Sequence, residues 1–325
     1  MSDKKFLDIL KADNLGRIPD NVPTLDNQDK YLPKEISDKI VKQLVEENFI
    51  RRLFPRVTIP LSMRNLTIPA IVYDSNTVRV IGYGEDVTAG NEQTFTTKSI
   101  VLTPRLLVTY VDMIEDDLES AGVDTARIIR ETMTIRLAEA EERAELFGVF
   151  NASSGSYLNS FNGIYTIAAG SSCATSPITY TASDKKAFKI MDAKKALGVY
   201  GRDPRNLVLI CSTTFANALR QEDVVYNQSY RVDTDVLKTG TLPPIAGITV
   251  IETTHLDEKE NGEVAILVRK DAFVIGERKR VFFRTDDIPE KFSKRLIIAE
   301  EIDFKPQLIN SSDKYEGIVL IHKAS

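Results

Sequence analysis

The chain has 325 residues, 42% of them hydrophobic, which is enough for a substantial core in one or two domains. Its 42 Lys and Arg against 47 Asp and Glu give a net charge of -5, which excludes a broadly basic nucleic-acid binding surface, so any DNA contact should be weak. The only cysteines, Cys173 and Cys211, lack metal-ligand spacing, so we expect neither a disulfide framework nor a zinc site.

The chain starts without an apolar stretch of signal-peptide length. No window approaches the roughly 20 apolar residues that a membrane helix needs. We therefore expect synthesis in the cytoplasm and no membrane contact.

The first 55 residues predict an arm followed by a helix. Residues 1–33 contain three prolines among scattered charges and show no periodicity, which is typical of an extended arm without its own core. Residues 34–54 have a helical apolar stripe, which Pro33 can open and Pro55 must close.

Residues 56–111 are rich in β-branched and aromatic side chains and predict a long hairpin-like arm. Its middle, "GYGEDVTAGNEQTF" at residues 82–95, is polar and punctuated by glycines. Such an arm has two exposed edges, which invite aggregation in a monomer. The pattern therefore indicates that a neighbouring subunit covers it.

A helix of 23 residues is predicted from Thr125 to Phe147, about 35 Å long, with Asp124 as its N-cap and Gly148 as its stop. A continuous apolar stripe runs along it, at Ala126, Ile129, Met133, Leu137, Ala140, Ala144 and Phe147. The opposite face carries Glu131, Glu139, Glu141, Glu142 and Glu145 with Arg127, Arg130, Arg136 and Arg143. We expect that charged face to be solvated or to face another subunit.

The remaining chain mixes helices and strands, so the predicted fold class is α+β. A helix is expected from Ser183, as its cap, to Leu197, with Gly198 ending it. "NLVLICS", "GITVIET" and "EVAILVRK" predict buried strands, with the short helix "STTFANALRQ" between the first two. "KRVFFRT", "RLIIAEEIDFKPQL" and "EGIVLIH" predict further β-structure.

Candidate chemistry is sparse. His255 and His322 accompany no nucleophile motif, and "GYGEDV" lacks the third glycine and the helix of a dinucleotide site. "DEKENGEVAILV" starts like a calcium loop but has Val268 where a bidentate Glu is needed, so a turn between strands is expected.

Two charged clusters also have ordinary interpretations. Glu115, Asp116, Asp117 and Glu119 could serve a metal-dependent hydrolase, although a solvated helical turn explains them better. The five lysines of the second helix could hold phosphate, but its apolar residues Phe188, Ile190, Met191 and Leu197 favour an ordinary helix with a wet outer face. The sequence predicts no catalytic residue, metal or cofactor.

The order of parts resembles the major capsid proteins of tailed bacteriophages, which have the Hong Kong 97-type fold. "YGEDVTAGNEQTFTTKSIVLTPRLLVTYVDMIEDDLES" is similar to the family's extended loop entering the peripheral domain, and Thr125–Phe147 to its spine helix. "KIMDAKKALGVYGRDPRNLVLICSTTFANALRQ" is similar to the passage into the axial domain. The resemblance implies an arm and helix at 1–55, the extended loop at 56–103, the peripheral domain at 104–204, the axial domain at 205–285 and peripheral return strands at 286–325.

The resemblance implies a shell protein of the virion that forms hexamers and pentamers around double-stranded DNA, held by weak non-specific contacts. Expected partners are further copies, a scaffolding protein, a portal and decoration proteins. The loop tip, at Glu85, Asp86, Thr88, Asn91 and Glu92, is expected to contact an adjacent subunit.

Two departures from the family matter. The roughly 50 residues before the loop leave little room for a built-in scaffolding segment, so a separate scaffolding protein is expected. No lysine lies between Gly84 and Thr97, so we do not expect a covalent cross-link at the tip, and Lys98 falls on a predicted strand. The alternatives are an encapsulin-like compartment and, in another class, the metal-dependent hydrolase.

Overall fold

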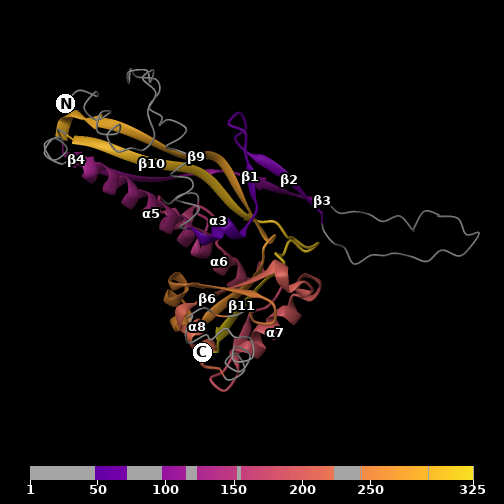
Figure 1. The fold of residues 1–325 in the computed structure, drawn as a ribbon. Helices are drawn as coiled ribbons and strands as arrows, with labels where there is room; N and C mark the ends of the chain where they lie inside the picture. The colour runs from indigo at the N-terminus through magenta and orange to yellow at the C-terminus, as the bar shows by residue number, and fades with distance from the viewer. Residues whose placement is uncertain are drawn as a thin grey trace, which may run out of the picture. The chain divides into compact units, whose positions relative to one another are not determined.

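The computed structural model describes residues 48–71, 97–114, 123–151, 155–222, 242, 244–291 and 293–324. These residues form two compact units, each assembled from separate stretches of chain (Figure 1). Unit 1 takes the described residues of Met1–Leu66, Leu102–Gly163 and Ile275–Phe304, and unit 2 those of Thr67–Val101, Ile164–Val274 and Lys305–Ser325. Two units do not test the five segments expected from the sequence, so the boundaries of those segments stay predictions.

Unit 1 is built on a four-stranded sheet in the order β1-β9-β10-β4. β1 (Arg56–Thr58) runs parallel to β9 (Phe273–Ile288), and β10 (Ser293–Pro306) runs antiparallel to β4 (Arg105–Ile114). The 3-10 turn η6 (Pro289–Lys291) lies between β9 and β10. The sequence-predicted β-segments at 279–285 and 295–308 therefore correspond to these two long strands.

The long helix α5 spans Val123–Phe147 and runs beside the sheet strands β4, β10 and β9 (Figure 1). Its predicted apolar stripe is confirmed where it is described, because Met133, Leu137 and Ala144 are buried. Gly148 ends the helix as predicted, with its amide donating to the Ala144 carbonyl at 2.8 Å. The predicted N-cap at Asp124 is wrong, because the helix already includes Val123.

The expected solvated face of α5 is also wrong over its last turns. Glu141, Glu142 and Glu145 are buried, and so is Thr134. Helix α3 (Phe49–Leu53), strand β4 and the 3-10 turn η1 (Tyr157–Asn159) all contact α5. The acidic side chains of these turns are therefore not solvated, whereas Glu131 and Glu139 are exposed as predicted.

Helix α3 covers Phe49–Leu53, and the rest of the predicted helix at 34–54 lies outside the described residues. Asn48 caps it, because its side-chain oxygen accepts hydrogen bonds from the amides of Ile50 and Arg51. The helix stops before Pro55, as predicted. Phe54 then packs edge-on against Phe304 of β10, with ring centroids 5.8 Å apart.

The stems of the predicted β-arm are β2 (Leu66–Ile71) and β3 (Thr97–Leu102), which pair in a two-stranded sheet. The intervening residues 72–96 lie outside the described residues. Lys98 lies on β3, as predicted. Its ammonium group donates to the carbonyls of Asn310 and Ser311 at 3.0 Å and to the Asp313 carboxylate at 2.6 Å.

Unit 2 contains a five-stranded sheet in the order β5-β11-β8-β6-β7. Its strands are β5 (Ile178–Tyr180), β11 (Ile318–Lys323), β8 (Val264–Arg269), β6 (Leu207–Ser212) and β7 (Thr249–Thr253). β6 runs parallel to β7 and antiparallel to β8, and β8 runs antiparallel to β11. β6 and β8 are the buried strands predicted, but β7 is only half-buried because it forms the sheet edge.

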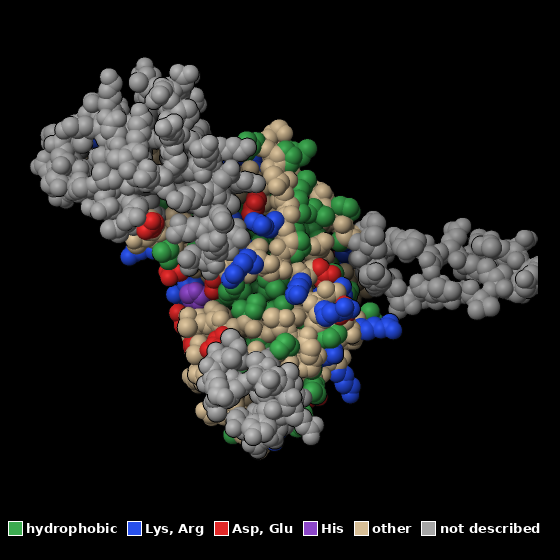
Figure 2. All heavy atoms as spheres, viewed as in Figure 1, with side chains coloured by type: hydrophobic (Ala, Val, Ile, Leu, Met, Phe, Trp, Pro, Cys, Tyr) green, Lys and Arg blue, Asp and Glu red, His purple; other side chains and the backbone are tan. Residues whose placement is uncertain are grey.

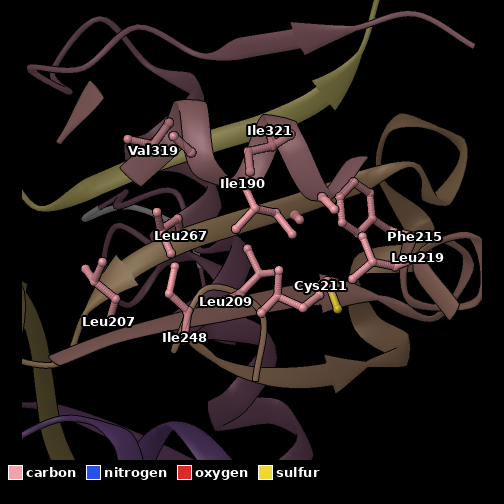
Figure 3. Close-up of a cluster of buried hydrophobic side chains, with 14 of the residues drawn as sticks. Ile190, Leu207, Leu209, Cys211, Phe215, Leu219, Ile248, Leu267, Val319 and Ile321 are labelled. Atoms are coloured by element: carbon pink, nitrogen blue, oxygen red, sulfur yellow. The ribbon is translucent and has the colours of Figure 1, made fainter. Parts of the chain in front are cut away.

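The core of unit 2 lies between this sheet and helices α7 (Lys186–Ala196) and α8 (Thr213–Gln221) (Figure 3). The labelled side chains in that view come from β6, β8, β11, the two helices and Ile248, which directly precedes β7. They are Ile190, Leu207, Leu209, Cys211, Phe215, Leu219, Ile248, Leu267, Val319 and Ile321. A further helix, α6 (Ile164–Ala169), contacts β11. Unit 2 thus has a core of its own.

The residue that caps the start of α7 differs from the prediction. Ser183 is not its cap, because the helix begins three residues later at Lys186. The Glu222 carboxylate, from the end of α8, accepts instead from the amides of Lys186 at 2.5 Å and Ala187 at 3.1 Å. Gly198, at φ +58°, follows the helix and ends it as predicted.

The apolar residues of α7 are divided between core and surface. Ile190 and Leu197 are buried as expected, but Phe188 and Met191 are 51% and 43% exposed. The prediction of one ordinary apolar face is therefore wrong for these two side chains. The helix buries Ala187 and Ala193 against the sheet in their place.

Short 3-10 turns complete unit 2, namely η2 (Gly198–Gly201), η3 (Pro204–Asn206), η4 (Thr254–Glu258) and η5 (Glu260–Gly262). η4 and η5 join β7 to β8, which confirms the turn predicted in place of a calcium loop. The Asp257 carboxylate accepts from the amide of Thr214 at 3.2 Å.

Candidate functional site

The loop-tip residues predicted to contact an adjacent subunit, Glu85, Asp86, Thr88, Asn91 and Glu92, lie outside the described residues. Their contact with a neighbour therefore stays a prediction. The described residues include the base of the arm. There β2 pairs with β3, and the Lys98 ammonium group donates hydrogen bonds to three acceptors.

Strand β4 presents an exposed apolar face in unit 1. Leu106, Val108 and Tyr110 are 54%, 48% and 58% exposed, whereas Leu107 between them is buried. Successive side chains of a strand point to opposite sides of the sheet, so the three lie on one side. β4 is also the edge of its sheet, and an exposed apolar edge strand is a common place for a partner to bind.

Ion pairs flank this β4 face. The Arg295 guanidinium makes two hydrogen bonds to the Asp112 carboxylate, at 2.6 and 2.8 Å, and lies 4.5 Å from the centre of the Tyr110 ring. The hydrogen bonds from Arg295 lower the pKa of Asp112. Arg278 pairs with Glu301 at 2.8 Å.

A second exposed apolar group lies on unit 2. Phe188 and Met191 of α7 and Val199 of η2 are all exposed, close to lysines of the same helix. This surface combines apolar side chains with positive charge. The helical pattern predicts the lysines on the outer face of α7, but it does not predict that Phe188 and Met191 are exposed there too.

A buried charged cluster ties the first described helix to the rest of unit 1. The Arg51 guanidinium contacts Glu141 of α5 through Nε at 2.6 and 2.8 Å, Glu277 of β9 through Nη1 at 3.3 Å, and Glu300 of β10 through Nη2. Asn48 donates to Glu145 of α5 at 3.2 Å. Arg51, Glu141, Glu145 and Glu300 are each at most 3% exposed.

Burial sets the pKa values in this cluster. Burial raises the pKa of Glu141 even though Arg51 opposes the rise, and burial with the charge of Glu141 raises the pKa of Glu145 well above its usual value. Burial likewise raises the pKa of Glu300 to about 8. Burial alone would lower the pKa of Arg51, but the charges of Glu141 and Glu300 outweigh it and raise that pKa.

The described residues hold no group of three or more His, Cys, Asp and Glu arranged to bind a metal ion. Both cysteines are buried free thiols, and burial raises the pKa of Cys211 to about 12, so it is a poor nucleophile. The hydrolase candidates Glu115, Asp116 and Asp117 lie outside the described residues. Among the described helices, none is long and apolar enough to cross a membrane.

The sequence analysis missed the buried cluster. The i, i+4 spacing of Glu141 and Glu145 puts them on one face of α5, but the same spacing is common on solvated helices. Arg51 lies 90 residues from Glu141, 226 from Glu277 and 249 from Glu300 in the chain. No local pattern links positions so far apart.

Comparison with solved structures gives matches over most of the chain. The capsid of a native GTA particle matches with a TM-score of 0.62 at 15% identity, covering 85% of this chain and 90% of that one. The mature capsid of bacteriophage PhiM1 matches with a TM-score of 0.58 at 11% identity, covering 86% and 87%. The procapsid of satellite phage P4 with its size determination protein matches with a TM-score of 0.55 at 11% identity, covering 89% and 100%.

These likenesses confirm the α+β Hong Kong 97-type fold expected from the order of elements. No curated protein matches the chain. Neither the encapsulin-like nor the hydrolase alternative is favoured by the matches.

The model of the phage capsid family matches residues 30–311, which is most of the chain. That span includes the arm stems, α5, the four-stranded sheet with its β4 face, and every strand of the five-stranded sheet except β11. The chain belongs to the phage capsid family and is a structural protein of the bacteriophage capsid.

Proposed function

We propose that this protein is a major capsid protein that self-assembles as hexamers and pentamers into an icosahedral shell enclosing double-stranded DNA. The observation that carries the proposal is the match of the phage capsid family over residues 30–311. Capsid structures with TM-scores up to 0.62 among those above support it. No catalytic step is part of this function, so we propose no enzymatic activity.

The geometry of unit 1 suits a plate in a thin shell. Helix α5 is a 25-residue rod packed beside a sheet whose two central strands have 16 and 14 residues. A rod and long strands stiffen a structure along its length, and a rigid subunit transmits the same angle to each neighbour. Repeated heterologous contacts at a fixed angle close into rings.

The exposed face of β4 is the contact surface that we assign to a neighbouring copy. It offers Leu106, Val108 and Tyr110 with polar pairs at its border, and interfaces commonly combine an apolar centre with a polar rim. A further copy of this chain is the partner that shell assembly supplies. The loop tip, at Glu85, Asp86, Thr88, Asn91 and Glu92, would add polar contacts to an adjacent subunit.

Weak, non-specific contact is the relation to DNA that the charges favour. The net charge is -5, and on the face drawn in Figure 2 the lysines and arginines are scattered among hydrophobic and uncharged groups. Dense basic surfaces bind DNA tightly because they release many counterions, and this face is not dense in cations. Such a wall would hold packaged DNA without fixing it.

The remaining partners follow from the same function. A scaffolding protein separate from this chain, a portal and decoration proteins would associate with the shell. The protein would be synthesised in the host bacterial cytoplasm before it enters the virion. The division into arm, extended loop, peripheral domain and axial domain at the boundaries given above is part of this proposal.

Particle formation tests the proposal directly. Purified full-length chain, alone and with the scaffolding protein, should give megadalton particles on sizing chromatography and closed shells in negative-stain images. A chain that stays monomeric at high concentration with scaffolding protein supplied would contradict the proposal.

A further inference from the structure

The charged cluster around Arg51 contains more negative than positive groups. Arg51 comes from α3, Glu141 and Glu145 from α5, Glu277 from β9 and Glu300 from β10. Among the described residues, Arg56 of β1 also pairs with a member of this cluster, since its guanidinium lies 3.7 Å from Glu277 and its side chain is 41% exposed. In the described part of the chain, four carboxyl groups of this cluster therefore face the cations Arg51, which is buried, and Arg56, which is not.

Electrostatics does not allow all of these carboxyl groups to be ionised. If Arg56 balances Glu277 at the border, then Arg51 alone faces Glu141, Glu145 and Glu300, which are all at most 1% exposed. Each buried charge without a counter-charge costs several kcal/mol. Protonation removes that cost, and because burial makes the ionised form unfavourable, the pKa of such a carboxyl group is raised.

Two oxygen atoms in the cluster lack hydrogen-bond donors. Glu145 Oε1 and Glu300 Oε1 are buried and have no partner, whereas the second oxygen of each accepts from Asn48 and Arg51 respectively. An ionised carboxylate can only accept, so an unpartnered oxygen in this setting is costly. A protonated carboxyl group is neutral and can itself donate a hydrogen bond.

We propose that the Arg51 cluster is a proton-binding site that fastens α3 to α5 and β10, and that loss of its protons releases α3 while the sheet of unit 1 stays folded. The ligand is the proton, and its binding groups are Glu145 and Glu300. The α3 segment also packs through Ile50 and Phe54, which are buried, with the Phe54 ring 5.8 Å from that of Phe304. The cluster supplies the polar part of its attachment, and only this part depends on the protons. The site acts within one folded chain and does not depend on shell assembly.

The direction of the pH dependence follows from the raised pKa values. Burial raises the pKa of Glu300 to about 8, and the pKa of Glu145 is also raised by burial. A carboxyl group whose pKa is higher when α3 is docked binds more protons in the docked state. The attachment of α3 is therefore strongest below the ordinary glutamate pKa of 4.5 and weakens as the pH rises through about 8, the pKa of docked Glu300.

Hydrogen exchange measured by mass spectrometry on the full chain tests this proposal. The reporter is a peptide covering residues 49–54, in which the Phe54 amide donates to the Ile50 carbonyl. After correction for the intrinsic exchange rate, its opening equilibrium should rise about tenfold per pH unit between pH 6 and 8 for each proton released. A peptide covering β8, which lies in the core of unit 2, should keep its protection over the same range.

Matched variants locate the protons. Glu300→Gln and Glu145→Gln keep the size of the side chain but cannot ionise, so each should flatten the pH dependence of the 49–54 peptide. Glu139→Gln, an exposed position on the same helix α5, should leave the wild-type slope unchanged.

Two results would overturn the proposal. One is a wild-type opening equilibrium that does not change between pH 6 and 8, which needs no variant and so holds even if a variant fails to fold. The other is a full wild-type slope in both Glu145→Gln and Glu300→Gln.

Discussion

Arg51 links three separate stretches of unit 1 through one side chain. Its guanidinium contacts carboxylates from α5, β9 and β10 while its own helix, α3, contributes only five residues. The planar guanidinium has five donors, so it can satisfy several carboxylates at once, which a lysine could not do with the same geometry. The residue therefore holds α3 in place chiefly by long-range contacts.

Replacing Arg51 with methionine should destabilise the subunit strongly. The change leaves the buried Glu141 carboxylate, which accepts from Arg51 Nε, without its cation, and breaking a buried ion pair in this way costs about 3–5 kcal/mol. Urea denaturation of the unassembled chain at pH 7 measures the loss. Because acid neutralises the carboxyl groups, the loss should shrink when the measurement is repeated near pH 5.

Arg52 provides the control for this prediction. It is the next residue of α3 but is exposed. Arg52→Met should change the free energy of unfolding by no more than about 0.5 kcal/mol. Equal changes in the free energy of unfolding for the two substitutions would show that the buried contacts of Arg51 do not stabilise the subunit.

At the scale of elements, successive side chains of β4 point to opposite sides of the sheet, so one side of the strand packs in the core and the other is exposed. Leu107 is 4% exposed and packs inside unit 1, while its neighbour Val108 is 48% exposed on the other side of the sheet. One side of the strand therefore stabilises the subunit, and the other is free to contact a neighbour. Helix α5 shows no such separation over its last turns, where apolar and acidic side chains are buried together.

An aspartate placed on either side of β4 should give opposite results. Val108→Asp should leave the melting temperature of the unassembled chain nearly unchanged but impair particle formation, because it puts a charge into the proposed contact. Leu107→Asp should lower the melting temperature, because the charge has no partner in the core. Circular dichroism melts and sizing chromatography distinguish the two, and normal particles from Val108→Asp would remove the β4 face from the interface.

At the scale of the whole molecule, we propose that part of the chain serves assembly rather than its own core. The stems β2 and β3 form only a two-stranded sheet, and an isolated hairpin of two strands is marginally stable in water. Lys98 secures the base of this sheet through Asn310, Ser311 and Asp313. The contacts that the segment beyond the stems makes are proposed to lie in adjacent copies.

Deleting Gly84–Glu92 should therefore impair assembly and spare the subunit. The urea midpoint of the unassembled chain should stay close to the wild-type value, while the yield of particles falls sharply, because the deletion removes contact area between chains. A loss of monomer stability as large as the loss of assembly would show that the loop serves its own subunit instead.

Local patterns in the sequence determined the elements of this protein and their order. The apolar stripe predicted α5 to within two residues at its start and correctly at Phe147, and β-branched runs predicted β6, β8, β10 and β11. Helix periodicity and turn chemistry act over a few neighbouring residues, so they can be recognised without the fold. The order of these elements was enough to indicate the capsid family.

Only the tertiary structure decided which polar groups are buried and what they contact. Glu141 and Glu145 belong to the charged side of α5 in the sequence, yet α3 packs over them, and Glu222 replaces Ser183 at the start of α7. A charged residue looks the same in the sequence whether water or a distant arginine satisfies it. Its partner depends on which distant segments pack against it, and only the folded chain brings those segments together.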